Sequence, residues 1–283
     1  MNSGGIRKKL KRDQIVGANY HYTRYTFDYF VRSVKSLGLD AIELYAADPH
    51  LYVGEDDPDR LRRVKQALKS SGIKVKCFTP ENCVYPINIA LEDEDVRSRS
   101  LAYYRRAIEY AAELEAPLVQ TVGGRGYYDG DLSGAWSRSA DSLGKMAAIA
   151  KGYGITLVLE ASSYATSTVI HSCRNIRDML DELRLDNVKA MIDTNAVYMA
   201  GEDFEDCVRL LGSDLIHMHF IDARPGAYCL VPGEGEMPLG HYLEILAQYG
   251  YKGVLTPELW GNTYVQDPET ALKNSVAYCL RRI

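Results

Sequence analysis

Four short apolar runs in the second half of this 283-residue sequence each end in a side chain that can bind a metal ion. The end residues are Glu160, Asp193, His219 and Glu258. Successive runs are separated by about the length of one strand, one helix and two loops, which is the repeat of a βα unit. Neighbouring parallel strands would bring the four side chains to one edge of a sheet. Carboxylates crowded there repel one another unless a cation or a proton intervenes, so the spacing predicts a divalent-cation site.

A second histidine, His217, lies two residues before His219, so both side chains leave the same face of the predicted strand. Only His219 lies at the strand end. We therefore expect His217 at a deeper position, where it contacts substrate, orients a ligand or is a hydrogen-bonded core residue.

The elements that must position these residues alternate strictly between apolar runs and amphipathic stretches of helical period. The predicted strands are 15–20, 41–46, 75–79, 118–122, 156–160, 188–193, 215–220 and 253–258. The predicted helices are 29–37, 58–70, 93–114, 133–151, 174–183, 204–211, 239–248 and 268–282. This order predicts an α/β protein with a (β/α)8 TIM barrel rather than an open doubly wound sheet. The four ligands then lie at the C-terminal face of the barrel, where the active sites of such barrels are found.

Composition limits the classes of function. The sequence is 46% hydrophobic and 25% charged, which is typical of a soluble protein with a large core. Nothing resembling a linker divides it, so we expect one domain at residues 13–283 after a disordered basic lead-in at residues 1–12. The net charge of -5 disfavours a nucleic-acid partner, and no apolar run is long enough to span a membrane. Six scattered cysteines fit reduced thiols, so we expect a cytoplasmic protein.

Other residues near the predicted strand ends are candidates for substrate contacts, together with His217. Asn88 lies in a polar loop after the third strand and could bond sugar hydroxyls. Glu43 comes near the end of the second strand, His50 lies in the loop after it, and Tyr22 follows the first strand. Arg125, in a glycine-rich stretch after the fourth strand, could hold a phosphate or a carboxylate.

Three features together resemble a known family: the four ligand segments, the loop that contains Asn88, and the segment Pro-Gly-Glu-Gly-Glu-Met-Pro-Leu at residues 232–239. They are similar to the xylose-isomerase-like barrels that epimerise ketoses at C3. The fructoselysine 3-epimerase branch is the nearest, and the D-tagatose and D-allulose 3-epimerases are more distant. The resemblance, from about Gly17 to Leu259, implies an isomerase of small sugars that forms a homodimer or homotetramer. It also implies Mn2+, or else Mg2+ or Co2+, held by the four ligands.

The chemistry of such a reaction agrees with the residue types. Inverting C3 of a ketose or a ketosamine requires a base that removes the proton next to the C2 carbonyl and an acid that returns a proton on the opposite face. Glu160 and Glu258 are expected to alternate in these two roles, while a cation stabilises the cis-enediolate. Either glutamate could be the base, depending on the configuration of the substrate.

The sequence differs from the tagatose and allulose branch at three positions. By resemblance, Ala196 stands where that branch has a histidine, Cys229 where it has an arginine, and Thr166 where it has a glutamate. These differences disfavour free allulose or tagatose as the substrate, and a ketose with an amino-linked or other substituent remains open as the substrate.

Other functions remain open on the same barrel. A sugar isomerase, a dehydratase or a lyase of C-glycosides (3-oxo-glycosides) would use the same ligands, because each begins by acidifying a C–H next to a carbonyl. A zinc endonuclease of the same superfamily is disfavoured by the negative net charge and the single histidine among the ligands. A non-catalytic sugar-binding subunit is the alternative of another class.

Overall fold

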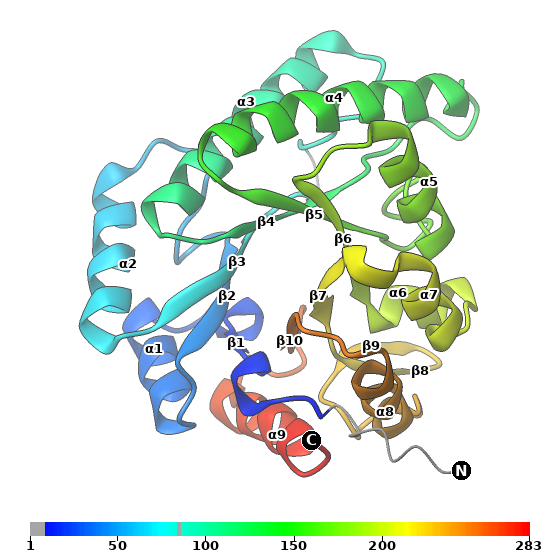
Figure 1. Cartoon of the computed structure of the whole chain (residues 1–283). Coiled ribbons are helices and arrows are strands. Elements are labelled where there is room, and N and C mark those ends of the chain that lie inside the picture. The colour runs from blue at the N-terminus through cyan, green and yellow to red at the C-terminus, as the bar shows by residue number, and fades with distance from the viewer. Residues whose placement is uncertain (1–8, 84–85) are drawn as a thin grey trace, which may run out of the picture.

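The computed structural model describes residues 9–83 and 86–283. Eight parallel strands follow one another round a barrel in the order β1-β2-β3-β4-β5-β6-β7-β10. Figure 1 shows these strands inside a ring of helices. The barrel closes where Ile15 bridges Leu255 in parallel and the amide of Val16 donates to the carbonyl oxygen of Leu255 at 3.2 Å. The predicted (β/α)8 TIM barrel is confirmed.

Every predicted strand and helix has a counterpart in the structure. The barrel strands are β1 (Gly17–Ala18), β2 (Ala41–Ala46), β3 (Lys74–Pro80), β4 (Leu118–Val122), β5 (Thr156–Glu160), β6 (Val188–Asp193), β7 (Leu215–His219) and β10 (Val254–Thr256). The predicted helices correspond to α1 (Phe27–Ser36), α2 (Pro58–Ser71), α3 (Glu94–Glu113), α4 (Leu132–Gly152), α5 (Cys173–Leu183), α7 (Phe204–Leu211), α8 (Leu239–Tyr249) and α9 (Pro268–Leu280). The first strand is shorter than predicted, because the chain turns at Tyr20 into a 3-10 helix, Tyr20–Tyr22.

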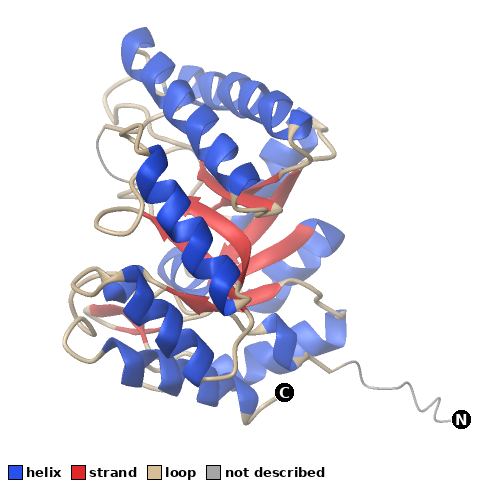
Figure 2. Ribbon diagram, turned by 90° about the vertical axis from the view of Figure 1, so that its left-hand side faces the viewer, coloured by secondary structure: helices blue, strands red, loops and turns tan. Residues whose placement is uncertain are grey.

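Local chemistry sets the ends of the helices. At the start of α2 the side chain of Asp57 accepts from the amide of Arg60 at 2.8 Å, and Pro58 occupies the first turn. The helix ends at Gly72, whose φ of 67° suits a residue without a Cβ atom. Its buried residues, Val64 and Leu68, face inward. Figure 2 shows the helices packed outside the strands, which is the layering that buries both faces of a parallel sheet.

Among the described α-helices and strands, three were not predicted. The short helix α6 (Thr194–Ala200) begins directly after β6, and β8 (Asp222–Arg224) pairs antiparallel with β9 (Ala227–Leu230). Helix α6 has only seven residues, too few for a helical period to stand out. The turn between β8 and β9 contains Pro225 and Gly226, and the φ of Gly226 is 77°. A proline followed by a glycine is typical of a tight turn, so this pair is the sequence feature that indicates the hairpin.

The sequence predicted a disordered basic lead-in at residues 1–12. Residues 1–8 of it lie outside the described residues, and residues 9–12 are described. Leu10 is buried in the main core. The guanidinium of Arg12 donates to the carbonyl oxygens of Leu37 and Gly38. Leu10 and Arg12 therefore pack on the barrel. Within the described ranges, the helices are all too short or too polar to cross a membrane.

Candidate active site

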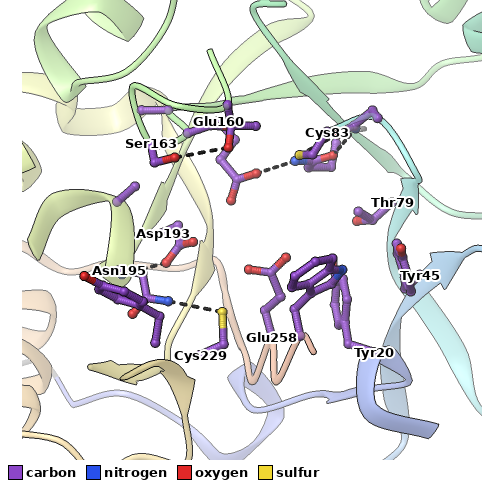
Figure 3. Close-up of a pocket in the computed structure, with 18 of the residues that line it drawn as sticks. Tyr20, Tyr45, Thr79, Cys83, Glu160, Ser163, Asp193, Asn195, Cys229 and Glu258 are labelled. Carbon is purple, nitrogen blue, oxygen red and sulfur yellow. Dashed lines mark hydrogen bonds between the residues drawn. The ribbon is translucent and has the colours of Figure 1, made fainter. Parts of the chain in front are cut away.

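The four predicted ligand residues lie together at the carboxyl end of the barrel. Glu160, Asp193 and His219 are the last residues of β5, β6 and β7, and Glu258 follows β10. Asp193 and His219 are register partners on neighbouring strands. Each of the four offers one ligand atom, and these atoms all lie within 4.8 Å of one another. Figure 3 shows the carboxylates of Glu160, Asp193 and Glu258 facing a common space.

Two buried polar atoms of this cluster have no hydrogen-bond partner among the described residues: Oε1 of Glu160 and Nδ1 of His219. They lie 2.9 Å apart, and Nδ1 is also 3.1 Å from Oε2 of Glu258. An unsatisfied buried polar group costs about 1–3 kcal/mol, so this arrangement calls for a further partner. Three carboxylates and an imidazole form a donor set suited to a divalent cation. The residues present therefore fit such an ion.

The charges of the cluster favour the same partner. Burial raises the pKa of Asp193 well above its usual range, and the negative charges of Glu258 and Glu160 add to the shift. Burial also raises the pKa of Glu258, against the attraction of His219. Burial alone would lower the pKa of His219, but the surrounding carboxylates outweigh it and raise that pKa well above its ordinary value. The cluster thus carries excess negative charge, which protons or a cation must balance.

Behind the cluster, the fully buried carboxylate of Glu43 holds His219. Oε1 of Glu43 accepts from Nε2 of His219 at 2.9 Å, and Oε2 accepts from Nε2 of His217 at 2.7 Å. The hydroxyls of Tyr20 and Thr79 each donate to Oε1 at 2.7 Å. Burial alone would raise the pKa of Glu43, but the two histidines outweigh it and hold that pKa well below its ordinary value. Because Nε2 of His219 donates to an anion, the lone pair of the neutral imidazole lies on Nδ1, which faces the other ligands.

A cavity of about 300 Å³ adjoins the cluster, and Glu160, Asp193 and Glu258 line it. Small-molecule sites span roughly 300–1,000 Å³, so this cavity suits a ligand of monosaccharide size. Further polar residues of the lining are Thr79, Glu81, Asn82, Gln120, Ser162, Ser163, Thr166 and Asn195. Its larger apolar and aromatic residues are Tyr20, Tyr45, Met199, Tyr228 and Trp260.

One lining residue that the sequence analysis missed supports a ligand directly. Nε2 of Gln120 donates to Oε2 of Glu160, and Nδ2 of Asn82 donates to Oε1 of Gln120. Gln120 therefore fixes the carboxylate of Glu160 while Oε1 of Glu160 stays directed at His219. A buried amide inside the apolar strand β4 is the signal that would have identified it.

A family model described as the xylose isomerase-like TIM barrel matches residues 31–283. The chain belongs to the xylose isomerase-like TIM barrel family. It is 27% identical over 248 residues to fructoselysine 3-epimerase of Shigella flexneri, covering 87% of this chain and 90% of that protein. It is 25% identical over 240 residues to D-psicose 3-epimerase of Ruminiclostridium cellulolyticum, covering 82% of this chain and 78% of that protein.

The solved structure of 3-keto-D-glucoside 4-epimerase from E. coli has the same fold, with a TM-score of 0.80 at 20% identity over 95% of this chain and 99% of that chain. The predicted family is confirmed. The prediction of an isomerase-type enzyme is confirmed as well, because the sequence relatives described above are named epimerases.

In this xylose isomerase-like barrel, the six residues predicted to contact substrate lie outside the described lining of the cavity: His217, Asn88, Glu43, His50, Tyr22 and Arg125. His217 and Glu43 bond one another below the cluster, and Tyr22 packs in the core with its ring centroid 5.0 Å from that of Phe30.

The other three predicted contacts stabilise loops. Oδ1 of Asn88 accepts from the amides of Ala90 and Arg125. The guanidinium of Arg125 donates to the carbonyl oxygen of Cys83 at 3.0 Å. Nε2 of His50 lies 2.9 Å from the carbonyl oxygen of Tyr25. In this structure these contacts within the protein hold the loops, and substrate contact by Asn88, His50 and Arg125 stays a prediction.

The three positions that differ from the tagatose and allulose branch all line the cavity: Thr166, Ala196 and Cys229. Nδ2 of Asn195 donates to Sγ of Cys229 at 3.2 Å, and the hydroxyl oxygens of Thr166 and Ser163 are 3.1 Å apart. The differences therefore lie where they can alter contacts with a substrate.

The segment at residues 232–239 lies outside the described lining, and the buried Asp222 holds it in place. Its Oδ2 accepts from the amide of Gly233 at 2.8 Å, and its Oδ1 accepts from the amide of Met237 at 3.1 Å. This segment thus supports the fold as a rigid turn that leads into α8.

Proposed function

We propose that this protein is a divalent-metal-dependent epimerase that inverts C3 of a ketose or a ketosamine of the fructoselysine type. The convergence of the four predicted ligands, with two unpaired buried atoms, beside a cavity of monosaccharide size carries this proposal. The names of the sequence relatives support the reaction class, because both denote 3-epimerases.

Glu160, Asp193, His219 and Glu258 would hold the cation, for which Mn2+ is our first choice and Mg2+ or Co2+ the alternatives. When bound, it supplies a Lewis acid that makes a C–H next to a carbonyl more acidic. Glu43 keeps Nδ1 of His219 directed at the ligand cluster through its hydrogen bond to Nε2.

Glu160 and Glu258 are the residues that we propose move the proton. They come from β5 and from the segment after β10, and Figure 3 shows their carboxylates entering the common space from different sides. One of them removes the proton at C3, and the other returns a proton on the opposite face of the substrate. Gln120 orients Glu160 for this role by donating to its Oε2.

The test is the incorporation of solvent deuterium at C3, followed by NMR in a panel of ketoses that includes fructoselysine and D-psicose, with Mn2+ added. We expect exchange and the appearance of the C3 epimer, and Glu258→Gln should abolish both. Glu244→Gln, on the exposed face of α8, controls for the loss of a carboxylate at the surface. Absence of exchange in every ketose would refute the epimerase, and isomerised, dehydrated or cleaved products would indicate the corresponding alternative enzymes. Sugar binding without any turnover would indicate a sugar-binding subunit.

A further inference from the structure

The charge of the cavity lining limits the substrates that it can hold. Its described residues include four carboxylates, Glu81, Glu160, Asp193 and Glu258, and no lysine or arginine. Two positive charges on a bound cation would still leave the three ligand carboxylates with a net negative charge. A phosphate group carries about -1.5 to -2 charges at neutral pH, and no basic side chain among the described lining residues would compensate that charge. The nearby Arg125 lies outside the lining, with its guanidinium on the carbonyl oxygen of Cys83.

Glu81 lines the cavity and is not one of the four residues of the cation cluster. It directly follows β3, its Oε2 accepts from the hydroxyl of Tyr45, and its Oε1 accepts from the amide of Cys83 at 3.0 Å. A carboxylate has about four acceptor positions, so each oxygen can take a further donor from a ligand. Glu81 is therefore a lining carboxylate that two donors hold and that can accept further hydrogen bonds.

The position of Glu81 depends on the network behind the cluster. The ring of Tyr45 stacks on Tyr20 with centroids 4.5 Å apart, and the hydroxyl of Tyr20 is bonded to Glu43. Burial, with the charge of Glu81, raises the pKa of Tyr45, so its phenol remains a hydrogen-bond donor. Figure 3 shows Tyr45 and Tyr20 side by side at one edge of the cavity. This network fixes Glu81 more firmly than a solvated surface carboxylate.

Aromatic side chains that line the same cavity also suit an ammonium group on a ligand. Tyr228 and Trp260 line it and remain 45% and 52% exposed, which leaves their rings accessible to a ligand. The faces of tyrosine and tryptophan rings attract ammonium groups. An ammonium group would thus meet a carboxylate and aromatic rings here, whereas an anion would meet carboxylates and no basic side chain among the described lining residues.

We infer that this cavity selects a ketose that carries a protonated amine and no phosphate, and that Glu81 binds the amine. The inference rests on the proposed function only for the nature of the sugar. Glu81 acts as a specificity-determining residue and takes no part in proton transfer at C3.

The probes are D-fructose, its 1-amino-1-deoxy and 6-amino-6-deoxy derivatives, and its 1-phosphate and 6-phosphate. Binding to the Mn2+-loaded protein is measured by calorimetric titration, and C3 exchange is measured in parallel. We expect one amine to bind about tenfold more tightly than D-fructose and both phosphates to bind more weakly. Because a hydrogen bond to a charged group is strong, Glu81→Gln should weaken the binding of that amine about 10- to 100-fold and weaken the binding of D-fructose much less.

Two results would overturn the inference: a phosphate that binds more tightly than D-fructose, or a Glu81→Gln variant that loses affinity equally for D-fructose and the amine. Glu244→Gln again controls for a lost surface carboxylate, and a thermal melt of Glu81→Gln shows that it is folded. Failure of the epimerase proposal looks different. In that case the ranking of ligands by charge appears in the binding data while C3 exchange is absent from every probe.

Discussion

Replacing Glu43 with glutamine tests whether the buried network behind the cluster orients His219. Glu43 accepts four hydrogen bonds, from the side chains of Tyr20, Thr79, His217 and His219. Glutamine keeps the shape of the side chain but is neutral and exchanges one acceptor oxygen for an NH2 group. His219 keeps a possible acceptor in the variant and loses the negative charge that holds its Nε2 proton.

The size of the effect follows from these contacts. A hydrogen bond to a charged group contributes about 1.5–3 kcal/mol, and one between neutral groups about 0.5–1.5 kcal/mol. The difference of about 1–1.5 kcal/mol at His219 corresponds to Mn2+ binding that is weaker by about tenfold. This lies at the low end of the roughly 10- to 100-fold losses typical of residues that support a metal-binding histidine.

The assay is a calorimetric titration of metal-free protein with Mn2+ for wild type, Glu43→Gln, Glu258→Gln and Glu244→Gln. We expect Glu258→Gln to lose more affinity than Glu43→Gln, because it loses a ligand, and Glu244→Gln to match the wild type. A folded Glu43→Gln variant with wild-type affinity would refute the orienting role of Glu43. A wild-type protein that binds no Mn2+ would refute the manganese site.

Three further predictions concern stability. Mn2+ at about 100 times its Kd should stabilise metal-free protein by about 2.7 kcal/mol in scanning calorimetry, and an equal shift in Glu160→Gln would contradict the site. Burial lowers the pKa of His21 from 6.5 to about 4, because the folded protein disfavours the charged imidazole. The stabilisation that neutral His21 contributes is therefore complete above pH ~6.5 and falls as the pH drops towards 4. Urea titrations should show a loss of about 2 kcal/mol between pH ~7.5 and pH ~5 that His21→Gln lacks, and equal pH dependence in both proteins would refute this assignment. Asp222→Asn should lower the free energy of unfolding by about 1–3 kcal/mol, because the carboxylate shared by the amides of Gly233 and Met237 loses one acceptor oxygen. Hydrogen exchange at these two amides should become faster, and unchanged exchange would contradict the role of Asp222.

The placement of the cluster could be predicted because a strand end is a local feature. An apolar run in a parallel sheet stops where the chain reaches the rim, and Glu160, Asp193 and His219 each end a strand in the structure. Glu258 lies two residues beyond β10 and reaches the same rim. The barrel then brings these side chains together, because parallel strands share one carboxyl edge.

The contacts with substrate could not be predicted in the same way, because they depend on the paths of loops. Tyr20 and Tyr22 are two residues apart, and an extended strand would direct both to one face. The 3-10 helix that begins at Tyr20 instead leaves Tyr20 in the cavity lining and buries Tyr22 against Phe30. No periodicity in the sequence indicates such a turn.

Partners from distant strands also decide what each carboxylate does. Glu43 lies within β2 and meets donors from β3, β7 and the 3-10 helix after β1, so all four hydrogen bonds are made within the protein and its role is to position others. Glu81 has two donors and can accept further hydrogen bonds, which suits a ligand. Glu160 receives one hydrogen bond from Gln120 and keeps an unpaired buried oxygen beside His219, which suits a cation. These three glutamates, which lie in or directly after barrel strands, look alike in the sequence, and the number of donors that the folded chain brings to each one separates their roles.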